Sequence, residues 1–181
     1  MNVIIKIDSL DVQRLLRQSP QIAEKALVRT LNRTADKARV AGSRAVRETY
    51  NIKAEDLKKS IRTYKASRSR MEAQLSITGK PVGLIAFAAK QTPKGVTYKI
   101  LKAAGRKRLA HAFIAKMKTG HIGVFERSGS DRLPIEERKF ITMPSVWQNR
   151  KIMGVIQKII SVELDKEWKA NWDYYWGQAN K

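Results

Sequence analysis

The chain has 181 residues, which is enough for one domain with a substantial hydrophobic core. Hydrophobic residues make up 43% of it, a globular share that argues against wholesale disorder. Lys and Arg number 37 against 16 Asp and Glu, which gives a formal net charge of +21. Because such an excess repels itself in a compact domain, we expect a polyanion to neutralise it. Nucleic acid is the first candidate, and acidic protein neighbours are the second.

Composition also excludes several classes of protein. The chain has no cysteine, which excludes disulfides and thiolate metal sites. No run approaches the roughly eighteen consecutive apolar residues of a membrane span. The first ten residues alternate at Val3, Ile5 and Ile7 and lack the small-residue cleavage site of a secretory signal, so we expect a strand there. We therefore expect a protein that is assembled inside the cell and does not bind a membrane.

The first long helix is predicted from Ser19 and Pro20, the cap and the first turn, to about Tyr50. At about 100° per residue, one side of this helix collects small and apolar residues: Leu27, Leu31, Thr34, Ala38, Gly42, Ala45 and Thr49. The roughly opposite side carries five cations, which we call the basic stripe: Arg29, Arg33, Lys37, Arg44 and Arg47. A solvated helix face normally mixes charges of both signs. The basic stripe therefore predicts a phosphate backbone nearby, with a merely solvated face as the alternative.

Shorter elements follow this helix. A second helix is predicted over residues 54–62, with Leu57 and Ile61 buried. The hydrophobic period then changes to two, and strands are predicted over three ranges: 71–77, 82–88 (a continuous apolar run, hence a central strand) and 96–100. Residues 103–108 are small and basic and predict a mobile loop. Its three cations, Arg106, Lys107 and Arg108, either reach a nucleic-acid backbone or are simply solvated.

The strongest hairpin signal lies between Phe113 and Phe125, with a turn at residues 118–121. A final helix is predicted from Pro144 to about Trp176. Its last part places three tryptophans on one face, Trp168, Trp172 and Trp176, which either packs on the protein's own sheet or anchors a partner. The sequence thus predicts an α+β fold in which a long N-terminal helix and a C-terminal helix pack on a small antiparallel sheet with a central hairpin. We expect a single domain over residues 1–181, with residues 64–135 mainly strands and 168–181 an aromatic tail.

Catalysis has little support in the sequence. The only histidines, His111 and His121, flank the predicted hairpin, whereas a nuclease or metal site needs several converging ligands. The carboxylates, Glu163 and Glu167 among them, are interpreted as surface charge. Phosphate-binding and dinucleotide glycine motifs are absent from the sequence. We expect no enzyme, no metal and no cofactor.

The stretch 112–127 and its continuation to Pro144 resemble the hairpin region of phage minor tail protein Z and related tail-completion proteins. The resemblance rests on an ordered series of positions: Phe113 in the opening strand, Gly120 in the turn, Phe125 and Arg127 in the second strand, the step Arg132, Leu133, Pro134 and Ile135, and Pro144 before a helix. It extends to residues 26–35 and 45–49, which look like the family's Ala-rich, Asn-Arg-containing helix, and to 52–62. The chain departs from the pattern at residues 65–105 and in the Trp-rich tail.

The resemblance implies a late virion protein at the head-proximal end of a long phage tail. Such a protein would form or join a ring, sixfold in our expectation, next to the tail terminator and the head–tail connector proteins. The ring would enclose the channel for double-stranded DNA, which it would contact without reading sequence. In this view the motif residues make subunit contacts, and the three tryptophans form a partner interface.

Two other functions stay open at this point. One is a free, non-enzymatic protein that binds nucleic acid independently of sequence, for which tight binding by the isolated monomer with a steep salt dependence would be evidence. The other is a packaging nuclease that uses His111 or His121, and we expect no such activity.

Overall fold

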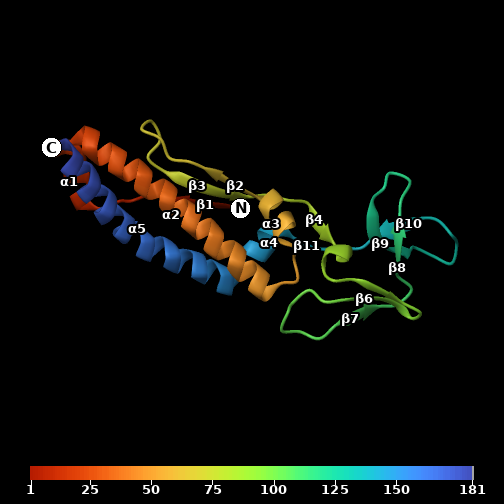
Figure 1. The fold of residues 1–181 in the computed structure, drawn as a ribbon. Helices are drawn as coiled ribbons and strands as arrows, with labels where there is room; N and C mark the ends of the chain where they lie inside the picture. The colour runs from red at the N-terminus through yellow and green to blue at the C-terminus, as the bar shows by residue number, and fades with distance from the viewer. Residues whose placement is uncertain (181) are drawn as a thin grey trace. The chain divides into compact units, whose positions relative to one another are not determined.

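A computed structural model describes residues 1–180 of the chain, and Figure 1 traces its elements. The elements divide between two compact units. Unit 1 holds residues Met1–Ser43 and Ile61–Ile77 and the chain from Asn149 onward, and unit 2 holds Arg44–Ser60 and Thr78–Gln148. The α+β class is confirmed, with long helices and small antiparallel sheets.

Unit 1 combines three helices with a three-stranded antiparallel sheet. Its elements are β1 (Asn2–Ile5), α1 (Leu10–Gln18), the first 24 residues of α2 (Pro20–Thr49), β2 (Ile61–Tyr64), β3 (Ala73–Ile77) and α5 (Arg150–Ala179). The strand order is β1-β3-β2, with Leu75 of the central strand paired to Val3 on one side and Thr63 on the other. The inward face of β3 is fully buried, as its alternation predicts.

Small residues allow α2 to pack tightly within unit 1. Leu27, Leu31, Thr34 and Ala38 are all buried, which confirms the predicted apolar side of this helix, and Ala23 is buried as well. Figure 1 shows the strands of unit 1 running alongside α2. Asn32 holds the β2–β3 connection to the helix: its Nδ2 donates to the Ala66 carbonyl at 3.1 Å, and the Ala66 amide donates to its Oδ1 at 2.7 Å. The two hydrogen bonds fix how the sheet lies along α2.

Unit 2 is built mainly from short antiparallel strands. It contains the last six residues of α2, then α3 (Ala54–Ser60), β4 (Pro81–Gly83), the 3₁₀ turn η1 (Leu84–Ala86), β5 (Lys90–Thr92), β6 (Gly95–Tyr98), β7 (Lys107–Leu109), β8 (Phe113–Lys116), β9 (Ile122–Arg127), β10 (Ile135–Glu137), β11 (Lys139–Thr142) and α4 (Met143–Trp147). Its sheets have the orders β10-β9-β8, β5-β6-β7 and β11-β4. Phe87, Val96, Val124 and Trp147 are fully buried in this unit.

Several predicted boundaries are wrong. The apolar run 82–88 is not a central strand: β4 ends at Gly83 and η1 follows. The run is apolar because Leu84 and Phe87 are buried in the turn, where the Phe87 amide donates to the Leu84 carbonyl at 3.0 Å. The second helix ends at Ser60, and Ile61 instead begins β2.

The helical regions also differ from the prediction at both ends of the chain. Helix α1, over Leu10–Gln18, was not predicted. The final helix is two helices, because Asn149 starts α5 afresh by accepting a hydrogen bond from the Lys151 amide at 3.0 Å. Asn in this position is a strong N-cap, so the chain turns before the long helix begins. None of the helices among residues 1–180 is both long and apolar enough to cross a membrane.

Candidate interaction surfaces

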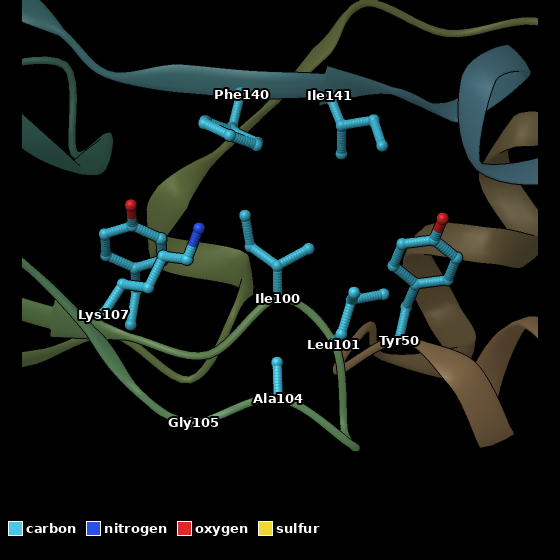
Figure 2. A pocket seen from close by; sticks show the side chains of 9 residues that line it. Tyr50, Ile100, Leu101, Ala104, Gly105, Lys107, Phe140 and Ile141 are labelled. Atoms are coloured by element: carbon cyan, nitrogen blue, oxygen red, sulfur yellow. The ribbon is translucent and has the colours of Figure 1, made fainter.

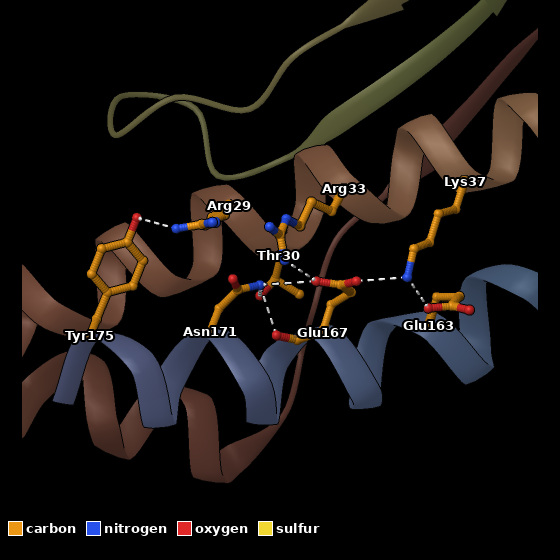
Figure 3. A network of polar contacts seen from close by, with 8 residues as sticks. All are labelled: Arg29, Thr30, Arg33, Lys37, Glu163, Glu167, Asn171 and Tyr175. Atoms are coloured by element: carbon orange, nitrogen blue, oxygen red, sulfur yellow. Dashed lines mark hydrogen bonds and ion pairs between the residues drawn. The ribbon is translucent and has the colours of Figure 1, made fainter. Parts of the chain in front are cut away.

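In unit 1, polar side chains join α2 to α5 in an antiparallel series (Figure 3). Lys37 Nζ donates to Glu163 Oε2 and to Glu167 Oε1, both at 2.6 Å. Arg33 Nη1 donates to the other oxygen of Glu167 at 3.1 Å. The Glu167 carboxylate is therefore shared by two cations that lie one turn apart on α2.

The series continues toward the C-terminal end of α5. Asn171 Nδ2 donates to Thr30 Oγ1 at 3.1 Å and to the Glu167 carbonyl at 2.8 Å. Arg29 Nη1 donates to the Tyr175 hydroxyl at 3.4 Å, and its guanidinium also lies 5.2 Å from the centre of the Tyr174 ring. We call the whole set the α2–α5 network: Arg29, Thr30, Arg33, Lys37, Glu163, Glu167, Asn171 and Tyr175.

Burial makes Glu167 the central residue of this network. It is only 7% exposed, whereas the side chains of Arg33 and Lys37 are 48% and 42% exposed. Burial by itself raises the pKa of the Glu167 carboxyl, but its hydrogen bonds to Lys37 and Arg33, and their charges, bring the net pKa below the ordinary value. The hydrogen bonds that Lys37 donates to Glu163 and Glu167 raise the pKa of Lys37. Glu167 is thus held ionised, and the interpretation of this residue as surface charge is wrong.

The structure divides the basic stripe into two parts. Arg29, Arg33 and Lys37 belong to the α2–α5 network of unit 1 and have partners inside the chain. Arg44 and Arg47 are exposed and belong to unit 2, where Arg44 pairs with Glu48 at 2.9 Å. The carboxylates that seemed to be missing from the stripe are supplied to Arg33 and Lys37 by α5. A sequence signal for this exists, because Glu163, Glu167, Asn171 and Tyr175 repeat every four residues, as do Arg29, Arg33 and Lys37.

The three tryptophans form a stacked ladder along α5 of unit 1, which we call the Trp ladder: Trp168, Trp172 and Trp176. The ring centroids of Trp168 and Trp172 are 5.8 Å apart, and those of Trp172 and Trp176 are 5.5 Å apart. Trp176 is 45% exposed, and the other two are half-buried. Each tryptophan directly follows a network residue of α5 in the sequence, so the ladder runs along α5 beside the α2–α5 network. It therefore presents an aromatic surface that is not fully covered by the residues that the structure describes.

The family-like positions gather around the β8–β9 hairpin of unit 2. Phe113 and Phe125 face each other across the strands, with ring centroids 6.3 Å apart, and the Arg127 guanidinium lies 5.3 Å from the Phe113 centroid. Phe125 is 6% exposed, so its ring stabilises this hairpin from inside. Ile135 extends the same sheet by pairing with Arg127.

The remaining family-like positions lie in turns. Gly120 has a φ of 84°, a left-handed conformation that favours glycine, and its amide donates to the Met117 carbonyl at 2.9 Å. Arg132 and Pro134 lie in the exposed connection before β10, and Pro144 lies in the first turn of α4. The hairpin predicted between Phe113 and Phe125 is confirmed, because β8 and β9 pair antiparallel on either side of the Gly120 turn.

The basic segment 103–108 is more ordered than a mobile loop. Arg106 Nη2 donates to the Ala88 carbonyl at 2.7 Å and to the Thr97 carbonyl at 3.1 Å. Lys107 and Arg108 then belong to β7, paired with Tyr98 and Thr97 of β6. The cations of this segment thus divide into Arg106, which bridges backbone carbonyls, and two that remain exposed on a strand.

Unit 2 also contains an apolar hollow of about 260 Å³ (Figure 2). It is lined by Tyr50, Tyr98, Ile100, Leu101, Ala104, Gly105, Lys107, Phe140 and Ile141. Leu101 and Phe140 are 39% and 61% exposed, so the rim of the hollow is apolar as well. A hollow of this size accepts an apolar side chain more readily than a cofactor.

The two histidines lie in different places: His111 is in the β7–β8 connection, whereas His121 lies beside a carboxylate of β10. His121 Nε2 lies 2.9 Å from Glu137 Oε1, and Lys139 Nζ lies 3.1 Å from the other oxygen of Glu137. Burial raises the pKa of the Glu137 carboxyl, and the hydrogen bonds from His121 and Lys139 more than reverse this, so the net pKa is lowered. Within residues 1–180, groups of three or more His, Asp or Glu suited to a metal ion are not found.

Comparison with protein families identifies the chain. The sequence model described as prophage minor tail protein Z matches residues 11–176. The chain belongs to the prophage minor tail protein Z family. The match runs from α1 to the end of the Trp ladder, so it includes both units and every surface described above. Searches of curated proteins and of solved structures give no significant match.

Membership of the minor tail protein Z family makes this chain a structural protein of a phage tail. The family match includes residues 65–105 and the Trp-rich tail up to Trp176, where the sequence seemed to depart from the pattern. In this minor tail protein Z, the Trp ladder, the rim of the apolar hollow and several cations of unit 2 are open to solvent.

Proposed function

We propose that this minor tail protein completes the head-proximal end of the tail and helps to join the tail to the head around the DNA channel. The observation that carries the proposal is the family match over residues 11–176. The net charge of +21 supports it, because a protein beside a DNA channel needs positive charge without base recognition. No catalytic role is part of the proposal.

The proposed assembly is a sixfold, head-to-tail ring that contacts the tail terminator and the head–tail connector proteins. A head-to-tail ring needs two different surfaces on each copy. The chain offers an exposed aromatic surface in unit 1, the Trp ladder, and exposed apolar and motif residues in unit 2, including Phe140 and Arg132. Tryptophan is enriched at the centres of interfaces, which supports the ladder as a partner contact.

The exposed cations would then face DNA or acidic neighbours. In unit 1 the half-exposed Arg29, Arg33 and Lys37 contribute to the positive field while keeping their partners in the α2–α5 network. In unit 2, Arg44 and Arg47 and the strand residues Lys107 and Arg108 are exposed. Because the network already uses three cations of the basic stripe, we place the closer phosphate contacts in unit 2.

Deletion of this chain from the producing phage tests the role. If the proposal holds, electron microscopy shows separate heads and tails or defective necks, and expression of the chain in trans restores joined particles. Gold labelling of a tagged chain should mark the head-proximal tail end. Label at the distal end of the tail, or normal joined particles without the chain, would overturn the proposal.

A free nucleic-acid-binding protein is the second candidate, favoured by the same charge excess. The two candidates differ in one observable. A tail component copurifies with intact particles through a density gradient, whereas a free binder stays with the cell lysate.

A further inference from the structure

Unit 2 contains a second hollow, polar in character and about 540 Å³ in volume. Its walls come from the β5–β6 turn, the β7–β8 connection and the edges of β8 and β9. The lining residues are Gln91, Pro93, Lys94, Gly95, Arg108, Ala110, His111, Ala112, Phe113 and Arg127. Three of them are cations, and His111 adds an imidazole. We call it the basic hollow.

The walls of the basic hollow are held in place by the backbone. Gly95 has a φ of 116°, and a Cβ at this position would lie 2.2 Å from the Leu109 carbonyl oxygen, so only glycine allows the turn to lie this close to β7. Gln91 links the turn to β8, because its Nε2 donates to the Thr92 carbonyl at 3.1 Å and its Oε1 accepts from the Ile114 amide at 2.8 Å. The hollow is thus formed before any ligand arrives.

His111 contributes a second unusual backbone conformation to the hollow. Its φ is 61°, which is uncommon for a residue other than glycine. Such conformations cost free energy and persist where surrounding structure holds them, often at binding sites. The β7–β8 connection therefore turns sharply at His111.

The cations of the basic hollow have no carboxylate partner among residues 1–180. The ion pairs of unit 2 use Arg44, Lys59, His121, Arg138 and Lys139. Lys94, Arg108 and Arg127 take part in none of them. This contrasts with Arg33 and Lys37, whose charges are met by α5.

Most of the sequence around the hollow lacks carboxylates. Residues 73–125 contain ten Lys and Arg and no Asp or Glu, although the chain has 16 acidic residues. Of the lining residues, only Arg127 lies outside this stretch. All of β5, β6, β7 and β8 lie inside this acid-free stretch. An incoming anion therefore meets no carboxylate from these strands.

We propose that the basic hollow is a phosphate-binding site that contacts the backbone of duplex DNA without reading its sequence. The proposal rests on the proposed function in taking channel DNA as the polyanion that the chain meets. Arg108 and Arg127 supply guanidinium groups that can donate two hydrogen bonds to one phosphate, and Lys94 supplies a point charge at the rim.

The lining of the hollow favours duplex DNA over other acidic partners. Binding of single strands depends on aromatic rings on which bases stack, and Phe113, the aromatic ring of the hollow, is half-buried with the Arg127 guanidinium 5.3 Å from its centroid. Protein partners are commonly anchored by large apolar or aromatic side chains at the centre of an interface. The lining of the hollow is instead dominated by polar and charged groups.

The test compares two triple variants of the full chain that lose the same charge. The site variant is Lys94→Gln, Arg108→Gln and Arg127→Gln. The control is Lys53→Gln, Lys58→Gln and Lys80→Gln, three exposed lysines of the same unit that do not line the basic hollow. Binding of a fluorescent duplex of about 30 base pairs, a length of roughly three helical turns, is followed by anisotropy over a range of salt concentrations.

The slope of log K against log salt becomes shallower by about 0.9 for each phosphate that the protein no longer neutralises. We expect the slope of the site variant to be shallower than that of the unmodified chain by about 2 to 3 and its affinity at moderate salt to fall about tenfold or more. We expect the control to keep most of its slope. Equal losses in both variants would overturn the proposal, because only the overall charge would then matter.

Further measurements keep the outcomes distinguishable. Near-ultraviolet circular dichroism shows whether the site variant is folded, and the single exposed replacement Arg108→Gln replaces it if it is not. A slope unchanged in the site variant, with the chain still located at the head-proximal tail end, overturns the DNA site and leaves the proposed function standing. A reduced slope with the chain absent from particles supports the site and overturns the tail role. Binding of acidic peptides but not of duplex would assign the hollow to a protein partner and overturn the DNA site.

Discussion

The two units handle positive charge in different ways. In unit 1, α5 brings carboxylates to α2, and the buried Glu167 meets two cations at once. In unit 2, the strands β5 to β8 contain no acidic residue, and the cations of the basic hollow have no carboxylate partner among residues 1–180. A high net charge therefore does not say where a polyanion binds. We expect a polyanion to bind where the cations have no carboxylate partners inside the fold.

Replacement of Glu167 by Ala should have the largest effect of the changes predicted here. It tests unit 1, where the cations have carboxylate partners. It leaves Lys37 and Arg33 without their shared carboxylate and Asn171 with one acceptor fewer. Because the cations are half exposed, we expect a loss of about 2 kcal/mol in the free energy of unfolding, less than for a fully buried pair. Urea denaturation measures it. Exposed Asp173→Ala is the control, with a change below about 0.5 kcal/mol, and equal effects would contradict a central role for Glu167.

Acid should weaken the same network. The pKa of Glu167 is lowered in the folded chain, so its contribution to stability is present above the ordinary carboxyl pKa of 4.5 and is lost as the pH falls through the folded value. We expect the free energy of unfolding to decrease below about pH 4.5. The decrease should be smaller in Glu167→Gln, measured by denaturation at a series of pH values. Identical pH profiles would show that other carboxylates, such as Glu137, dominate.

Substitution of Arg106 tests whether this cation of segment 103–108 stabilises the fold and does not bind a ligand. Its guanidinium donates to the carbonyls of Ala88 and Thr97, which Gln cannot reach in the same way. We expect Arg106→Gln to lower the free energy of unfolding by about 1 kcal/mol. Its effect on the salt slope of DNA binding should be smaller than that of Arg108→Gln. The reverse ranking would place the phosphate contact at Arg106 and not in the basic hollow.

Trp176→Ala should have the smallest effect on the isolated chain. Its ring is 45% exposed and is stacked on Trp172, so we expect a loss of less than about 1 kcal/mol in stability. If the Trp ladder is a partner interface, the same change should reduce ring formation, seen by native mass spectrometry. A large loss of stability without a change in assembly would assign the ladder to the fold of unit 1.

The sequence predicts the long, periodic elements and misses the irregular ones. Thirty residues of α2 repeat one apolar face, and that signal is strong enough to fix the helix and its buried side. The strand β3 is equally clear from the alternation Ala73, Leu75 and Ile77. The run 82–88 fails because burial of Leu84 and Phe87 in a turn makes the same apolar pattern as a strand.

The surfaces were less accessible to sequence reasoning, because they depend on contacts between distant residues. Lys37 and Glu163 are 126 positions apart, and nothing local shows that α5 will lie along α2. Only the matching four-residue repeats of the two helices indicate it. The basic hollow has a simpler signal, the absence of Asp and Glu from residues 73–125, but its walls depend on tight turns at Gly95 and His111.

The positions of the four tryptophans give the two units separate spectroscopic reporters. Trp147 is fully buried in unit 2, whereas the Trp ladder of unit 1 is partly exposed. The indole of Trp147 should emit at short wavelength, and the stacked ladder should give a coupled exciton signal in the ultraviolet. Loss of one signal before the other on heating would show that the units unfold as independent folding units within one chain.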